Sequence, residues 1–183
     1  MELKGEQILA LPREQVWAAL NDPAVLKQCV PGCDTFEPEG DNAYKVVMTA
    51  SVGPVKARFN GALTLSDIEP PVSYKLAFTG SGGAAGFGKG SAQVALAEVD
   101  AGTSLTYLVQ AQVGGKLAQV GARLIDGVAK KMADEFFTRF SKVVAAPAES
   151  DAHASNPDGT ASEASADAPA DAAAKPSRWW SRS

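Results

Sequence analysis

Residues 116–144 read KLAQVGARLIDGVAKKMADEFFTRFSKVV, and this stretch decides the fold. Its apolar residues recur at steps of three or four, the spacing that gathers side chains on one face of an α-helix. The apolar face consists of Leu117, Val120, Leu124, Ile125, Val128, Met132, Phe136, Phe137, Phe140 and Val143. A helix of this length extends for about 43 Å. It is long enough to cross a whole curved sheet, and Gly114-Gly115 marks its start.

The chain before this helix alternates between apolar and polar residues, as β-strands do. The clearest case is VKARFNGALTL at 55–65. The same alternation predicts strands around residues 44–48, 72–78, 94–96 and 105–109, with a plausible first strand at 2–11. Pro54 and Glu69-Pro70-Pro71 indicate hairpin turns. The pattern predicts an antiparallel meander with one buried face.

Two short helices are expected between the first strand and the meander. Pro12 stands at a first helical position before REQVWAALND, and Asp22-Pro23 begins a second helix that ends before Val30-Pro31-Gly32. This order of elements describes an α+β protein with a helix-grip fold. In that fold a bent antiparallel sheet of about seven strands wraps around the long C-terminal helix. Because a bent sheet and a straight helix do not fill the space between them, we expect a cavity.

The composition divides the chain into three parts. Residues 1–146 have the make-up of one globular domain, with 15 acidic and 14 basic side chains. Residues 147–177 contain no Val, Ile, Leu, Phe, Tyr or Met, so they cannot bury enough apolar surface to offset their ordering entropy. We therefore expect a disordered linker rich in Ala, Ser and Asp. Residues 178–183 form a separate tip.

The tip carries Arg178, Trp179, Trp180 and Arg182. Indole rings settle at membrane interfaces, where a nearby guanidinium can meet lipid phosphates. We therefore expect the tip to dock on a membrane surface or on a partner. An adhesive terminus without a function, or a short peptide ligand for another protein, would have the same sequence pattern.

Charge and hydropathy exclude several classes of protein. The near-neutral domain argues against nucleic-acid binding. The N-terminus has acidic residues and no continuous apolar stretch, and no window approaches the roughly 18 apolar residues of a membrane-spanning helix. We expect a cytoplasmic protein whose membrane contact is peripheral, at the inner face of the cell membrane.

The glycine-rich segment 80–90 contains the spacing G-x-x-x-x-G-K at Gly83–Lys89. A phosphate-binding loop would continue with Ser or Thr and then a helix, but Gly90 and an alternating strand follow. A mobile hairpin loop is the better interpretation. Its one large apolar side chain, Phe87, makes it a candidate gate to a cavity, or simply a flexible turn.

The domain contains few residues that could bind a metal ion or act in nucleophilic catalysis. Cys29 and Cys33 are too few for a zinc site, and we expect them to be reduced, partly buried thiols. The single histidine, His153, lies in the linker. The domain therefore cannot build a Ser-His-Asp or Cys-His pair, and we expect no metal and no catalytic residue, although carboxylate or lysine chemistry stays open.

Three segments together resemble the carbon monoxide dehydrogenase G-subunit family, within the START-like (polyketide cyclase-like) superfamily of ligand-binding domains. They are DPAVL at 22–26 leading into CVPGC at 29–33, VGPV at 52–55 with FNG at 59–61, and GGKLAQVGARLI at 114–125. Each motif is weak alone, but their order and spacing are fairly specific. The match covers nearly all of residues 1–145.

This resemblance implies a helix-grip cavity for a hydrophobic ligand. It also implies a non-catalytic accessory protein that binds a respiratory quinone (menaquinone or ubiquinone) and links a molybdenum-containing carbon monoxide dehydrogenase, or a related hydroxylase, to the membrane. An assembly or recruitment factor without a ligand, and a START-like enzyme acting on a hydrophobic substrate, remain alternatives.

Strand alternation and helix phase predict which side chains would line the cavity. They are Phe59, Leu63, Tyr74, Phe78, Phe87, Tyr107, Leu117, Val120, Leu124 and Val128. Each could equally be an ordinary core residue. Gly121, in the middle of the predicted helix, could mark either a close approach to a ligand or a site of helix–sheet packing.

Overall fold

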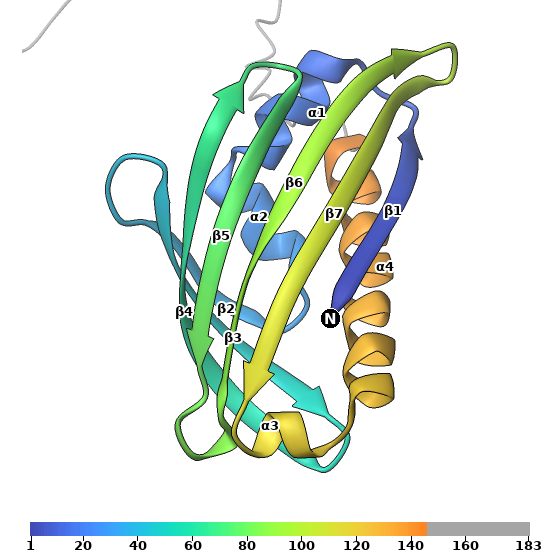
Figure 1. Ribbon diagram of the computed structural model, residues 1–183. Helices are drawn as coiled ribbons and strands as arrows, with labels where there is room; N and C mark the ends of the chain where they lie inside the picture. Colours follow the sequence, from blue (N-terminus) through green and yellow to red (C-terminus); the bar gives the residue numbers. More distant parts are fainter. Residues whose placement is uncertain (146–183) are drawn as a thin grey trace, which may run out of the picture. The chain divides into compact units, whose positions relative to one another are not determined.

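The computed structural model describes residues 1–145, so the predicted linker and tip lie outside the described residues. Figure 1 shows the arrangement of the described elements. In chain order they are β1 (Glu2–Leu9), α1 (Arg13–Leu20), α2 (Pro23–Cys29), β2 (Cys33–Pro38), β3 (Ala43–Val52), β4 (Val55–Glu69), β5 (Ser73–Ser81), the 3₁₀ turn η1 (Gly83–Ala85), β6 (Phe87–Val99), β7 (Gly102–Gly114), α3 (Lys116–Gln119) and α4 (Ala122–Ala145).

The seven strands form one antiparallel sheet in the order β1-β7-β6-β5-β4-β3-β2. Strands β2 to β7 follow one another as a meander, and β1 adds to the edge beside β7. The sheet bends around α4, with α1 and α2 toward one end of its concave side and α3 at the other (Figure 1). The predicted α+β helix-grip fold with seven strands is confirmed.

The two short helices begin where the sequence places them. Pro12 precedes α1 with extended backbone, and the carboxylate of Asp22 accepts a hydrogen bond of 2.9 Å from the backbone N–H of Ala24 at the start of α2. Pro23 then occupies a first-turn position, where its missing N–H costs nothing. The helix ends at Cys29, before Val30 and Pro31. Helix α2 packs mainly on α4 and β2, which fixes it beside the C-terminal half of the long helix.

The predicted continuous helix at 116–144 is wrong in one respect, because it is broken. The short helix α3 ends at Gln119, Val120 follows as its cap, and α4 starts at Ala122. Between them Gly121 has a φ of 94°, which residues with a side chain rarely adopt. A Cβ on Gly121 would meet nothing within 4 Å. Backbone conformation, and not close packing, is therefore the reason for glycine here.

Replacing Gly121 with alanine is expected to lower the free energy of unfolding by about 1–3 kcal/mol, because alanine is strained at this φ. The matched control is Gly127→Ala, inside α4, where the added Cβ also has open space and the expected change is a gain of about 0.5–1 kcal/mol. Urea denaturation followed by circular dichroism measures both. A gain for both variants would show that the helix continues through residue 121.

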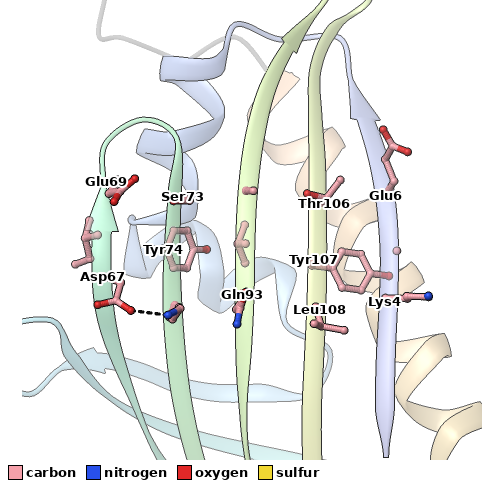
Figure 2. A pocket seen from close by; sticks show the side chains of 15 residues that line it. Lys4, Glu6, Asp67, Glu69, Ser73, Tyr74, Gln93, Thr106, Tyr107 and Leu108 are labelled. Atoms are coloured by element: carbon pink, nitrogen blue, oxygen red, sulfur yellow. Dashed lines mark ion pairs between the residues drawn. The ribbon is translucent and has the colours of Figure 1, made fainter.

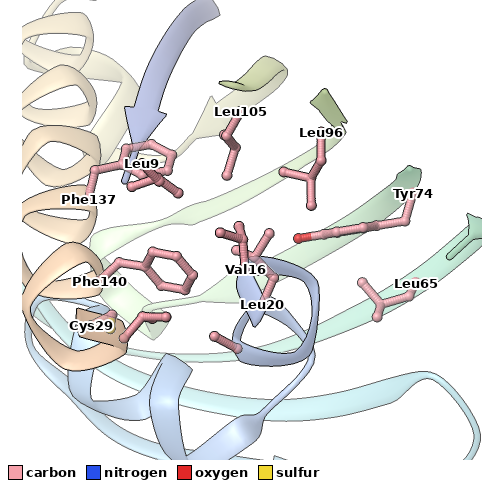
Figure 3. Close-up of a cluster of buried hydrophobic side chains, with 12 residues drawn as sticks. Leu9, Val16, Leu20, Cys29, Leu65, Tyr74, Leu96, Leu105, Phe137 and Phe140 are labelled. Atoms are coloured by element: carbon pink, nitrogen blue, oxygen red, sulfur yellow. The ribbon is translucent and has the colours of Figure 1, made fainter. Parts of the chain in front are cut away.

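The hydrophobic core fills one half of the concave space. It lies between the C-terminal half of α4, the helices α1 and α2, and the strand ends that adjoin the β4–β5 and β6–β7 turns (Figure 3). Its most buried large side chains are Val16, Leu105 and Phe140, each at most 1% exposed. Phe140 stacks on Phe136 with ring centroids 5.7 Å apart. This end of the domain is packed solid, and the space under the first half of α4 is not.

Candidate functional site

An apolar cavity of about 380 Å³ lies between the other half of the sheet and the helices α3 and α4. Its wall is almost wholly hydrocarbon. The large apolar side chains that line it include Phe36, Val46, Met48, Val52, Phe59, Leu63, Phe78 and Val113 from the sheet and Leu117, Ile125, Val128 and Met132 from the helices. The volume is at the lower end of the roughly 300–1,000 Å³ of small-molecule sites. The cavity can therefore hold a compact hydrophobic group.

Three glycines line the sheet side of this cavity. Gly61, Gly80 and Gly88 pair across the adjacent strands β4, β5 and β6, and we call them the glycine row. A Cβ on Gly80 would meet nothing within 4 Å, and one on Gly88 would make only ordinary contacts at 3.9 Å. Glycine inside a strand weakens the strand and often marks a place where a ligand approaches the backbone. Gly80 and Gly88 therefore leave empty space that ordinary strand residues would fill, whereas a Cβ on Gly61 would collide with the carbonyl oxygen of Thr79.

Five of the ten predicted lining residues lie around this cavity. They are Phe59, Leu63, Phe78, Leu117 and Val128. The structure brings them together from two strands of the meander, from α3 and from α4. Their contact with a ligand remains a prediction, but their common position on one apolar cavity is a feature of the structure.

The two predicted tyrosines lie in the packed half instead. Tyr74 is 6% exposed and packs edge-on against Trp17, with ring centroids 5.6 Å apart. Tyr107 stacks on Phe137 at 5.2 Å. Burial raises the pKa of both phenols, so both stay neutral at physiological pH. Alternation placed them on the concave face correctly, but it gave no position along the strand relative to the core.

The remaining three predicted residues do not line the cavity. Leu124 is 40% exposed, and its Cδ2 takes the space that a Cβ on Gly53 would need. Phe87 is 49% exposed, with its ring where a Cβ on Gly114 would be. Val120 caps α3. The break after α3 changes the helix phase, so a single helical face could not predict the positions of Val120 and Leu124. Phe87 is the first residue of β6 and adjoins the cavity-lining Gly88, so its side chain points to the other face of the strand.

Sequence reasoning missed part of the cavity wall. Ile125 and Met132 were assigned to the apolar helix face but not to the cavity, and they line it. The glycine row was missed altogether, because it becomes visible only when three strands are placed in register. The sequence signal was the occurrence of three glycines inside alternating segments, where glycine is otherwise unfavourable.

The predicted glycine-rich loop is shorter than expected. Strand β5 continues to Ser81 and β6 starts at Phe87, and their pairing extends to these two residues. The turn between them is η1, closed by a hydrogen bond of 2.8 Å from the N–H of Gly82 to the carbonyl oxygen of Gly86. The hairpin is confirmed, and three of the six glycines of segment 80–90 lie in strands. Whether Phe87 acts as a gate stays a prediction.

A model of the carbon monoxide dehydrogenase G-subunit (CoxG) family matches residues 5–145, which is most of the chain. The chain belongs to the CoxG family. A conserved protein from Geobacillus kaustophilus of known crystal structure is 35% identical, with a TM-score of 0.75 over 79% of this chain and 95% of that one. The predicted family is thus confirmed. No curated protein matches the chain.

Other solved structures share the fold of this CoxG family member. A protein from Rhodobacter sphaeroides is 19% identical, with a TM-score of 0.60 over 80% of this chain and 93% of that one. A protein from Chromobacterium violaceum is 15% identical, with a TM-score of 0.60 over 78% of this chain and 96% of that one. At these identities the likeness concerns the fold alone.

A larger hollow of about 950 Å³ lies on the outer face of the sheet in this CoxG family member (Figure 2). Its wall is mixed, and its polar side chains include Lys4, Glu6, Gln93 and an ion pair of 2.8 Å between Lys75 Nζ and Asp67 Oδ2. The hydrogen bond from Lys75 to Asp67 raises the pKa of the lysine. Both partners are at least half exposed, so this is a solvated surface pair and not a catalytic arrangement.

The two cysteines of this CoxG family member are free thiols. Cys29 is completely buried and Cys33 is partly exposed. Burial raises the pKa of both, so the reactive thiolate is disfavoured. Within residues 1–145 no group of three or more His, Cys, Asp and Glu side chains is placed to hold a metal ion. None of the helices in that range has the length and apolarity needed to span a bilayer.

The predicted docking residues, Arg178, Trp179, Trp180 and Arg182, lie outside the described residues. The candidate site is therefore the apolar cavity. It is formed by the glycine row on one side and by α3 and the first half of α4 on the other.

Proposed function

We propose that this protein is a non-catalytic accessory subunit that holds a respiratory quinone in its apolar cavity and links a carbon monoxide dehydrogenase, or a related molybdenum hydroxylase, to the membrane. Membership of the CoxG family supports the partnership with the dehydrogenase. The observation that supports a hydrophobic ligand is the empty, hydrocarbon-lined space above the glycine row. Leaving that space open costs stability, which ligand binding would offset.

The size of the cavity limits how the quinone would sit. Burying apolar area contributes roughly 25 cal/mol per Å², so a hydrocarbon wall binds a prenylated ring without many polar contacts. A volume of about 380 Å³ encloses a ring and the first isoprene units, but not a long chain. The rest of the chain would leave the cavity. Such partial enclosure suits a ligand that exchanges with a bilayer.

A series of quinones with increasing isoprene chains tests the proposal. The affinity of the purified full-length protein is expected to rise over the first isoprene units and then level off, because the cavity is full. Organic extraction of the protein followed by mass spectrometry identifies what it carries from the cell. No saturable uptake of any quinone, together with extracts free of lipid, would contradict the proposal.

In the proposed link to the membrane, the C-terminal tip binds the membrane surface and the linker tethers the domain to it. A linker of about 30 residues has an r.m.s. reach of about 30 Å, so the domain can turn between a surface and the dehydrogenase. Two tryptophans with two arginines give weak, reversible attachment, since stable peripheral anchoring takes more than one signal. A reversible tether fits a carrier better than a fixed anchor does.

The second candidate function is an assembly or recruitment factor without a ligand. A domain whose concave space was completely filled by its own side chains would favour it. Because the cavity along Leu117, Ile125 and Val128 is open, the carrier is the better supported of the two. An enzyme is the least supported, because residues 1–145 contain no histidine to act as a general base.

A further inference from the structure

The charges of the domain are separated between the two ends of its strands. The segments at the β2–β3, β4–β5 and β6–β7 turns contain six acidic side chains, Glu37, Glu39, Asp41, Glu69, Glu98 and Asp100, and one basic side chain, Lys45, which lies opposite Glu37. At the other end, residues 51–56, 81–87 and 114–124 contain three basic side chains and no acidic one: Lys56, Lys116 and Arg123. The near-neutral net charge hides this separation.

The basic side chains are available to a partner. Lys56, Lys116 and Arg123 are exposed, and none of them forms an ion pair within the described part of the chain. The first acidic residue beyond them along α4 is Asp126, which is also exposed. At the opposite end, Glu98 is paired with Arg13 at 3.7 Å and Glu37 lies opposite Lys45. The other four carboxylates there form no ion pair within the described residues.

Two exposed apolar side chains accompany these basic groups. Phe87 and Leu124, 49% and 40% exposed, lie on either side of α3. Phe87 covers Gly114, just before α3, and Leu124 covers Gly53 of the β3–β4 turn. Apolar groups surrounded by basic ones are typical of peripheral membrane contacts. Val72 and Val99 are exposed to a similar degree at the other end, but acidic residues surround them.

The basic end is also the end at which the cavity lies. Leu117 of α3 and Ile125 of α4 line the cavity from this side, and Figure 1 shows α3 between the β3–β4 and β5–β6 hairpins. Glycines with φ of 72° and 94°, Gly115 and Gly121, stand immediately before and after the α3 segment. A surface that met this end would therefore lie beside the α3 segment that helps to line the cavity.

We infer that the folded domain docks on an anionic lipid bilayer through its α3 end, with Phe87 and Leu124 entering the headgroup region and Lys56, Lys116 and Arg123 meeting lipid phosphates. This docking face is distinct from the C-terminal tip. It deepens the proposed function, on which it rests, because it presents the cavity to the membrane that holds the ligand. The six carboxylates at the opposite end are repelled by an anionic surface, so the charges orient the domain.

Vesicles of equimolar phosphatidylglycerol and phosphatidylcholine test the docking face. The full chain carries Trp179→Ala and Trp180→Ala, so that binding by the tip does not mask the domain. Each basic side chain near an anionic surface contributes roughly fivefold in affinity. Lys56→Gln, Lys116→Gln and Arg123→Gln together are therefore expected to weaken co-sedimentation by roughly 100-fold. Added salt is also expected to weaken vesicle binding by the parent, because it screens the attraction between the basic side chains and the lipid phosphates.

The matched control removes the same net charge elsewhere. Lys27→Gln, Lys45→Gln and Lys130→Gln change three exposed lysines that lie outside the α3 end, and this variant is expected to bind vesicles nearly as well as the parent. Equal weakening of the two triple variants would show a net-charge effect and overturn the inference. No weakening in either would also overturn it, and would leave the basic end to a protein partner.

A second pair of variants tests the apolar contribution without changing charge. Phe87→Ser with Leu124→Ser is expected to weaken binding at least tenfold, and Val72→Ser with Val99→Ser is expected not to. Quinone uptake from solution, measured on the parent and on all variants, separates the two proposals. A parent that takes up quinone but does not bind vesicles overturns the docking face alone, and a parent that binds vesicles but takes up no quinone overturns the quinone carrier alone.

Discussion

Replacing Gly88 with leucine is expected to lower the affinity for a hydrophobic ligand by roughly 100-fold while the domain stays folded. A leucine side chain takes the place of about four CH₂ groups of ligand, each contributing about 0.8 kcal/mol when buried, or about 3 kcal/mol together. The new side chain points into the cavity, because Gly88 lines it and its Cβ position is open. Isothermal titration with a short-chain quinone measures the loss.

Folding is expected to tolerate this change. Gly88 is not among the residues with positive φ, so a side chain adds no backbone strain. Leucine also removes the entropic cost of a glycine inside a strand. Gly80→Leu, on the neighbouring strand, is expected to act in the same way. The control is Gly127→Leu, which adds the same side chain to open space on the exposed surface of α4. If the control lost as much affinity as Gly88→Leu, the cavity would not be the binding site.

Replacing Phe140 with alanine is expected to lower the free energy of unfolding by about 3–5 kcal/mol. Its ring is completely buried between α4 and the helices α1 and α2, in the filled half of the domain (Figure 3). Neighbours as tightly packed as Val16 and Leu20 cannot collapse into the space that the ring leaves. Urea denaturation measures the change from the transition midpoint at constant slope.

The matched control for this prediction is Phe59→Ala, the same change in the cavity half. The Phe59 ring already borders empty space, so its removal is expected to cost only about 1–2 kcal/mol. Equal losses for the two variants would mean that the cavity is filled by side chains in solution. A smaller loss for Phe59 would show, by stability alone, that the two halves of the concave space are packed differently.

Local patterns predicted the elements of this domain well. Alternation located every strand except β2, and Pro12, Asp22 and Pro54 marked real helix starts and a real turn. These signals are local, because residues only a few positions apart in the sequence are enough to specify them. The one error in a long element was the helix break at Gly121, because the apolar spacing continues through it. A positive φ leaves no periodic trace in a sequence.

The cavity was predicted to exist, and the structure divides the residues predicted to line it between the cavity and the core. Phe59, Phe78 and Val128 line the cavity, whereas Tyr74 and Tyr107 belong to the core. All five lie on the same concave face or the same helix face, so periodicity treats them alike. Which part of that face is filled depends on where α1 and α2 pack.

The sequence by itself determined the family, the seven-stranded helix-grip fold and the concave face, since residue spacing specifies local structure and buried faces. Only the tertiary structure decided which half of that face is core and which is cavity. It also decided that three glycines from separate strands become neighbours and that the basic residues gather at one end. These features depend on strand register and helix docking, which join residues far apart in the chain, and no local spacing encodes such distances.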